Sequence, residues 1–279
     1  MIDVSPNFAI GYYVIILLGY IIYKTMNAPS TATAGGGDAE IVSPLIGGLF
    51  IAAILIGEYM ISIGMIKTVC GFEQWGFGAM VTFVPWVLIA GMIKFILMLR
   101  PGWLVPFSNT IGYFLASAIF GLTESFGKIV PNNFKPSADS GEAGTDVAKA
   151  IHEIYEDQSL LINQMTPDNL QKMIVNFTAA GIIIGPSQNG GITRNDYDLC
   201  IESITKAVYF KLFVSEFIWL LLAGILVISI TFNYIVNYGC KMTSEQLVKK
   251  QEKMAAVSAA QATAAKASAD TTTVYSSHD

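Results

Sequence analysis

Charged residues are scarce in this chain. Only 13% of its 279 residues are Asp, Glu, Lys or Arg, whereas 53% are hydrophobic. A soluble globular domain carries about a quarter charged residues, so this composition disfavours a water-soluble fold. The formal net charge is −5, and no stripe of Lys and Arg stands out. We therefore expect no nucleic-acid partner, because nucleic-acid binding needs clustered cations to neutralise phosphates.

Cysteine and histidine, which are common ligands of transition metals and common catalytic residues, are also rare. The chain has three cysteines, Cys70, Cys200 and Cys240, and two histidines, His152 and His278. The cysteines show no C-x-x-C or Cys/His spacing, so we expect buried or lipid-facing thiols, with a single disulfide as the alternative. No nucleophile elbow, P-loop, H-E-x-x-H or G-x-G-x-x-G motif occurs. The sequence predicts no catalytic residue, no cofactor, no metal site and no enzymatic activity.

Long apolar runs are what the chain has in abundance. Phe217–Val236 contains no charged residue, and twenty helical residues at about 1.5 Å each cross a hydrocarbon core of about 30 Å. Similar runs occur upstream. The sequence therefore predicts an all-α integral membrane protein with a bundle of four or five transmembrane helices in a lipid bilayer. The apolar segments are residues 8–23, 44–66, 77–99, 103–126 and 207–238.

The polar stretches between these runs divide the chain into five parts. The first span is preceded by Asp3 and followed by Lys24, the reverse of a signal peptide, so we expect it to stay uncleaved. The Gly/Ala/Thr-rich linker that follows this span has few apolar side chains to bury and is expected to be flexible. The parts are the N-terminal span and linker (1–43), membrane helices two to four (44–127), a small extramembrane helical domain (128–206), the last transmembrane helix (207–238) and a polar Ala/Lys-rich tail, helical or disordered (239–279).

Turn and cap residues predict where several helices begin and end. Residues 100–102 (RPG) predict a sharp break between the third and fourth apolar segments. Residues 166–168 (TPD) predict a helix start and Gly181 its end. Asn195 is expected to cap a further helix. Because no Pro or Gly interrupts residues 196–223, that helix is expected to run into the last span as one rod.

Glu58 is the strongest candidate for a functional side chain, because a carboxylate near the centre of a span is costly and often functional. Lys94 lies about 13 Å away in depth at the helical rise, so we expect it to extend towards Arg100 and the headgroups instead. Pro85 lies near the depth of Glu58 and removes the N–H that would bond the Val81 carbonyl. We expect a protonated Glu58 to donate to that carbonyl. The alternatives are proton or cation conduction, and contact with water or a neighbouring subunit.

A second polar group interrupts the fourth apolar segment. Ser108, Asn109 and Thr110 are of the kind that commonly hydrogen-bond between membrane helices, and we expect that structural role for them. A pore-lining or headgroup-binding role is the alternative. Lys211 and Glu216, near the start of the last span, are expected at the headgroup boundary.

Residues 99–114 read LRPGWLVPFSNTIGYF. This stretch resembles a segment of the multi-span membrane proteins of large icosahedral nucleocytoplasmic DNA viruses, minor capsid proteins of the internal membrane under the shell. The resemblance implies a structural role in the virion. It implies spans in a membrane derived from the host endoplasmic reticulum, and a 128–206 domain and C-terminal tail that meet capsid or other membrane proteins. An ion channel or transporter subunit that uses Glu58, or an accessory subunit of a cellular membrane complex, are the alternative functions.

Overall fold

The computed structural model describes residues 5–29, 44–130, 156–186 and 192–238, together with isolated positions at 149, 152–153, 252 and 256–257. Every regular element among these residues is helical, and none of them forms a strand. The predictions for the Gly/Ala/Thr linker, for residues 131–148 and for nearly all of the C-terminal tail lie outside the described residues.

Five helices are long and apolar enough to cross a membrane. They confirm the predicted all-helical membrane fold, since a backbone in lipid has to satisfy its own hydrogen bonds. The five are Pro6–Met26, Leu45–Cys70, Trp75–Leu99, Pro101–Phe120 and Arg194–Tyr238.

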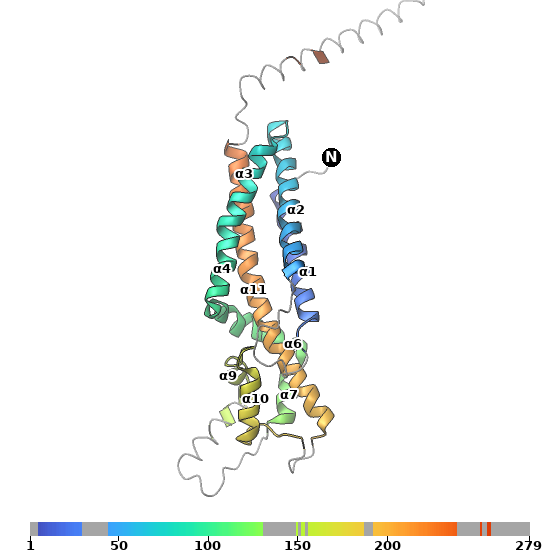
Figure 1. Ribbon diagram of the computed structural model, residues 1–279, viewed down its shortest axis with the longest axis vertical. Coiled ribbons are helices and arrows are strands. Elements are labelled where there is room, and N and C mark those ends of the chain that lie inside the picture. The colour runs from blue at the N-terminus through green and yellow to red at the C-terminus, as the bar shows by residue number, and fades with distance from the viewer. Residues whose placement is uncertain are drawn as a thin grey trace, which may run out of the picture.

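Four of these segments lie side by side and form the membrane bundle (Figure 1). The third of them is not a uniform α-helix, because it continues after Pro85 as a π-helix. Proline lacks the N–H of a regular turn, and a wider turn is one way for a helix to continue past it. The elements of the bundle are α1 (Pro6–Met26), α2 (Pro44–Cys70), α3 (Trp75–Pro85), the π-helix η1 (Trp86–Gly91), α4 (Met92–Leu99) and the C-terminal half of α11 (Arg194–Tyr238).

The helix α11 is unbroken over 45 residues, about 67 Å at the helical rise. This confirms the predicted rod. Its cap was predicted wrongly, because the helix begins before Asn195. The Thr193 hydroxyl accepts the N–H of Asp196 at 3.1 Å and donates to the Asp196 carboxylate at 2.7 Å, which is a capping arrangement that satisfies one N–H of the first turn.

The helix α10 (Leu170–Ala179) ends where the sequence predicts but begins later. The N–H of Thr166 donates to the side chain of Asn169 at 2.8 Å, so a turn precedes the helix. At its other end Gly181 adopts a left-handed φ of 72°. This conformation lets the Ile182 N–H return to the Phe177 carbonyl at 2.9 Å.

The remaining apolar segment is broken into four short elements after the predicted turn at residues 100–102, where Arg100 leaves the helical conformation with φ −133° and ψ 74°. Figure 1 shows this segment, in green, crossing the lower end of the bundle. The elements are the 3-10 helix η2 (Pro101–Leu104), α5 (Val105–Phe107), the π-helix η3 (Ser108–Gly112) and α6 (Tyr113–Phe120).

Contacts with α11 show how far this segment extends along the axis of α11. At its start the Trp219 indole donates to the Trp103 carbonyl at 2.9 Å. At its end the rings of Phe120 and Phe210 pack with centroids 5.5 Å apart. The segment therefore advances along α11 only from position 219 to position 210, about 13 Å at the helical rise, where a span needs about 30 Å. We infer that it lies across the base of the bundle.

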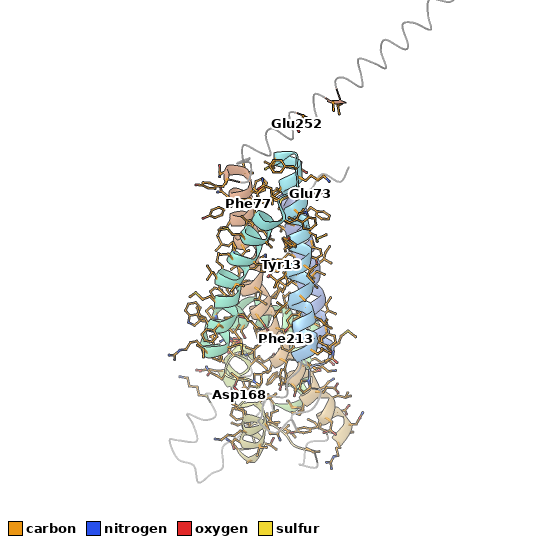
Figure 2. All side chains as sticks on the ribbon, turned by 45° about the horizontal axis from the view of Figure 1, so that its top comes forward. Tyr13, Glu73, Phe77, Asp168, Phe213 and Glu252 are labelled. Atoms are coloured by element: carbon orange, nitrogen blue, oxygen red, sulfur yellow. The ribbon has the colours of Figure 1, made fainter. Side chains whose placement is uncertain are left out.

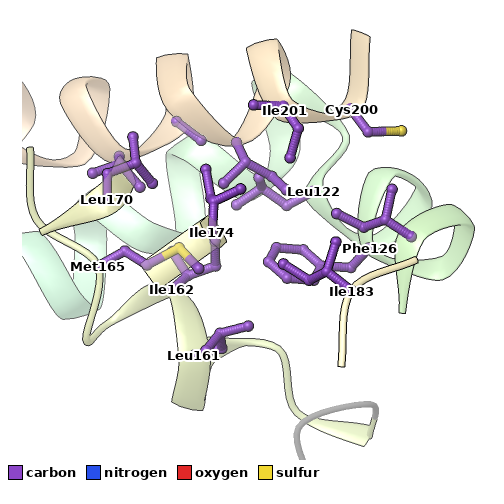
Figure 3. Packing of buried hydrophobic residues seen from close by; sticks show 14 of the residues in the cluster. Leu122, Phe126, Leu161, Ile162, Met165, Leu170, Ile174, Ile183, Cys200 and Ile201 are labelled. Carbon is purple, nitrogen blue, oxygen red and sulfur yellow. The ribbon is translucent and has the colours of Figure 1, made fainter. Parts of the chain in front are cut away.

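Two hydrophobic cores lie along α11. The bundle core joins α11 to α1, α2 and α3. The domain core packs α6, α7 (Leu122–Ile129), α9 (Ser159–Ile162) and α10 against the first turns of α11. Figure 3 shows Leu122, Phe126 and Ile174 of this core below Ile201 of α11. One helix thus supplies a wall of both cores.

The cysteines differ from one another. Cys70, the last residue of α2, forms a disulfide, so the predicted free thiol is wrong for this residue and the alternative of a disulfide holds. Cys200 is buried and free, as predicted. Cys240 lies outside the described residues.

A substitution at Gly112 tests the close contact between α11 and the segment Pro101–Phe120, which we call the crossing segment. A Cβ at Gly112 would lie 2.5 Å from the Lys211 carbonyl oxygen, so we expect Gly112→Ala to lower the free energy of unfolding by about 1–3 kcal/mol. Gly127→Ala in α7 is the control, because a Cβ there meets nothing within 4 Å. Thermal unfolding in detergent measures both variants, and equal melting temperatures would contradict this packing.

Candidate functional site

Three helices meet at Glu216 of α11. The Lys24 ammonium, in the last turn of α1, lies 2.5 Å from one carboxylate oxygen, and Lys94 of α4 pairs with the other oxygen. Glu216 is 8% exposed. We call this group of three charges the latch. It joins residues that are far apart in the sequence, and Figure 2 places the neighbouring Phe213 at the lower end of the bundle.

The latch is supported by its surroundings. Lys24 lies over the ring of Phe213, 4.6 Å from the ring centre, and 5.5 Å from the ring centre of Tyr20. Such contacts stabilise a cation over the face of an aromatic ring. One carboxylate neutralises only one of the two lysines. The Lys94 side chain is 42% exposed, so solvent or headgroups screen the remaining positive charge.

The sequence did not predict the latch. Lys94, expected to extend towards Arg100 and the headgroups, pairs with Glu216. Glu216, expected at the headgroup boundary, lies at the edge of the apolar bundle as the partner of both lysines. A buried carboxylate is tolerated when it is paired, and a sequence does not show which helices are neighbours. The exclusion of a Glu58–Lys94 pair holds, since Glu58 forms no ion pair among the described residues.

The latch marks one edge of the apolar bundle. From Glu216 to Tyr238 the helix α11 extends about 33 Å at the helical rise, close to the thickness of a hydrocarbon core. At the opposite end Lys67 and Glu73 form an exposed ion pair of 2.8 Å beside the α2–α3 turn. The hydrogen bond from Lys67 lowers the pKa of the Glu73 carboxyl. Charged pairs therefore border the bundle at both ends.

Below the latch, two side chains of α11 bind the neighbouring backbone. Lys211 is 1% exposed, and its ammonium donates to the Ile162 carbonyl at 2.5 Å. Ile162 ends α9, where carbonyls without helical partners favour a cation. The Ser215 hydroxyl donates to the Leu104 carbonyl at 2.6 Å. These bonds attach both the domain and the crossing segment to α11.

The polar residues 108–110 of the fourth apolar segment also lie at the base of the bundle, beside α11. Ser108 is buried in η3, which packs against α11. The Thr110 hydroxyl donates to the Pro106 carbonyl of the same segment at 2.6 Å. Asn109 is partly buried. The residues gather at the base of the bundle, not along an axis through it.

Inside the bundle, the carbonyl of Val81 has a different donor from the one predicted. The hydroxyl of Thr231 on α11 donates to it at 2.9 Å. Pro85 does free this carbonyl, but a threonine on the adjacent helix reaches it instead of Glu58. The prediction of a Glu58–Val81 hydrogen bond is therefore wrong.

Glu58 itself lies in the middle of α2 and is 3% exposed, and its Oε1 has no hydrogen-bond partner. Its neighbours on α1 are engaged elsewhere. Tyr13 donates to the Leu220 carbonyl at 2.7 Å, and Tyr12 donates to the Ala53 carbonyl at 2.6 Å. Figure 2 shows Tyr13 near the middle of the bundle. An unpaired charge at this depth costs about 3 kcal/mol or more, so Glu58 is favoured in its neutral, protonated form.

Among the described residues, the buried charged groups of the latch and Lys211 join helices to one another, whereas Glu58 forms no ion pair. Within the described ranges no cluster of three or more His, Cys, Asp or Glu side chains is placed to hold a metal ion. No family model, curated protein or solved structure matches this chain. The geometry of these residues is therefore the basis for a functional conclusion.

The latch can be tested by removing its acid. Glu216→Gln leaves two lysines without their counter-charge, and we expect the free energy of unfolding to fall by about 3 kcal/mol. The matched control is Glu124→Gln, which breaks the exposed Glu124–Lys128 pair of 2.7 Å and should change nothing measurable. Unfolding by denaturing detergent measures both variants. Equal small losses would show that the latch does not hold the helices together.

The Thr231–Val81 bond can be tested by a double-mutant cycle. Thr231→Val should cost about 1–2 kcal/mol, because it leaves the Val81 carbonyl unpaired in lipid. Pro85→Ala restores the N–H of a regular helix at this carbonyl. In that background Thr231→Val should cost measurably less. Additive losses in unfolding experiments would show that Thr231 and the proline are not coupled through Val81.

Proposed function

We propose that this protein is a structural transmembrane anchor, which ties a lipid bilayer to a protein layer beside it. The observation that carries the proposal is the continuity of α11, one helix of 45 residues that forms part of both the membrane core and the domain core. A helix packed at both ends transmits position and orientation without a hinge. The domain is therefore held at a fixed height above the bilayer.

The polar contacts support an anchor. The latch, the Tyr13–Leu220 bond and the Thr231–Val81 bond fasten the bundle to α11. The Lys211–Ile162 bond fastens the domain to the same helix. Each of these groups is used to join one helix to another. A conduction pathway needs polar groups that are free to bind and release an ion.

The setting that we propose is the internal membrane of a large icosahedral DNA virus. The support is the resemblance of residues 99–114 to minor capsid proteins of such viruses. This stretch forms the crossing segment, which lies between the bundle and the domain. In this setting the domain meets capsid proteins, and the C-terminal tail meets other membrane proteins. The membrane derives from the host endoplasmic reticulum, and the protein performs no catalysis.

A distance measurement tests the rigid coupling. Spin labels at Leu199 and Leu226, which are 54% and 50% exposed, should give a narrow distribution near 40 Å, the helical rise over 27 positions. Tyr209→Pro with the same labels is the control, since a proline inside the helix should bend it and broaden the distribution. A broad distribution without the proline would contradict the rod.

Measurements of ion flux in liposomes that contain this protein alone distinguish an anchor from a channel. An anchor should be electrically silent alone and should be present in stoichiometric amounts in purified membrane-containing particles. Selective ion flux that Glu58→Gln abolishes would contradict the proposed function and favour a channel.

A further inference from the structure

The interior of the bundle contains two polar atoms that take no part in the hydrogen bonds and ion pairs between its helices. They are Oε1 of Glu58 and Oγ1 of Thr82, both buried and without a hydrogen-bond partner. Glu58 is 3% exposed and Thr82 is 0% exposed. Buried polar atoms are nearly always paired with protein or with ordered water, so both atoms need an explanation.

The two residues lie at the same level on adjacent helices. Tyr59, which follows Glu58 on α2, packs its ring on that of Phe83, which follows Thr82 on α3, with centroids 5.4 Å apart. The Tyr59 hydroxyl also donates to the Trp75 carbonyl at the start of α3. Glu58 and Thr82 are both turned into the bundle. They therefore border the same part of the interior, although they do not bond directly.

Thr82 is unusual among the helical threonines. A threonine in a helix commonly donates to the carbonyl four residues earlier, which leaves its hydroxyl satisfied. In this protein Thr25, Thr68, Thr110, Thr178 and Thr205 do so. Thr82 does not. Its hydroxyl is therefore available to a group in the bundle interior.

Among the residues that the structure describes, none supplies a counter-charge to Glu58. The helix α1 contributes Tyr12 and Tyr13, whose hydroxyls already donate to carbonyls. The segment formed by α3 and η1 contains no titratable side chain. On α11 the hydroxyl of Thr231 donates to Val81, and Glu216 is occupied in the latch. A carboxyl in such surroundings is neutral, because a buried charge without a partner is strongly disfavoured.

We propose that Glu58 and Thr82 form a proton-binding site at the centre of the bundle, in which the protonated carboxyl and the hydroxyl share one internal water molecule. A water that bridges the two satisfies both orphan atoms. Loading is a simple transfer: the Glu58 carboxylate takes a proton from hydronium, and water is released. This inference goes beyond the anchor and is independent of it.

Infrared spectroscopy of the protein in liposomes tests the site. A carbonyl band of a protonated carboxylic acid should be present at neutral pH and should be lost in Glu58→Gln. Glu73→Gln is the control and should leave the band unchanged, because Glu73 is ion-paired at the surface. Thr82→Val removes the hydroxyl at nearly constant shape and should shift the band to higher frequency, whereas Thr82→Ser should not.

Three outcomes would overturn the site. They are the absence of the band at neutral pH, its persistence in Glu58→Gln, and an identical band position in Thr82→Val and Thr82→Ser. If Glu58→Gln does not fold, the unmodified protein gives the answer by reaction with a lipid-soluble carbodiimide and peptide mapping. Such reagents attack protonated carboxyls, so the adduct should fall on the α2 peptide at Glu58. An adduct elsewhere, or none, counts against the proposal.

Discussion

The fold depends on the need to neutralise Glu216. This carboxylate lies at the edge of the apolar bundle and is almost fully buried, and its two partners come from the ends of α1 and α4. A buried acid without partners is strongly destabilising, so helices that lie far apart in the sequence are held at one level of α11. That level is also where the crossing segment meets α11 through Ser215 and Trp219. This level of α11 therefore joins the edge of the apolar bundle to the segment that leads into the domain.

Along α11 the character of the contacts changes with depth. In the bundle, single hydroxyls bond single carbonyls, as Thr231 does with Val81 and Tyr13 with Leu220. At the base the contacts are made by charged groups, with Glu216 in the latch and Lys211 of α11 bonded to the Ile162 carbonyl of α9. This order fits the surroundings, since lipid penalises charge more than it penalises a satisfied hydroxyl. Glu58, a buried acid inside the bundle, departs from this order.

Local features of the chain could be predicted from the sequence. The long helix α11 follows from a stretch without Pro or Gly, and the end of α10 follows from Gly181. The partners of Glu216 and of the Val81 carbonyl could not be predicted, because they depend on which faces of separate helices meet. The direction of the crossing segment could not be predicted for a similar reason. Pro101–Phe120 is apolar enough to span a membrane, and only its contacts with α11 show that it advances little along that helix. The one available signal for the latch was that Lys24, Lys94 and Glu216 each lie near the end of a predicted span.

The two ends of the bundle carry different parts of the protein. The start of α1 and the end of α11 lie at one end, at the top of Figure 1. The helices α7, α9 and α10 lie beyond the other end. A bilayer around the bundle therefore separates the domain from the last turn of α11, and a partner of one would not reach the other.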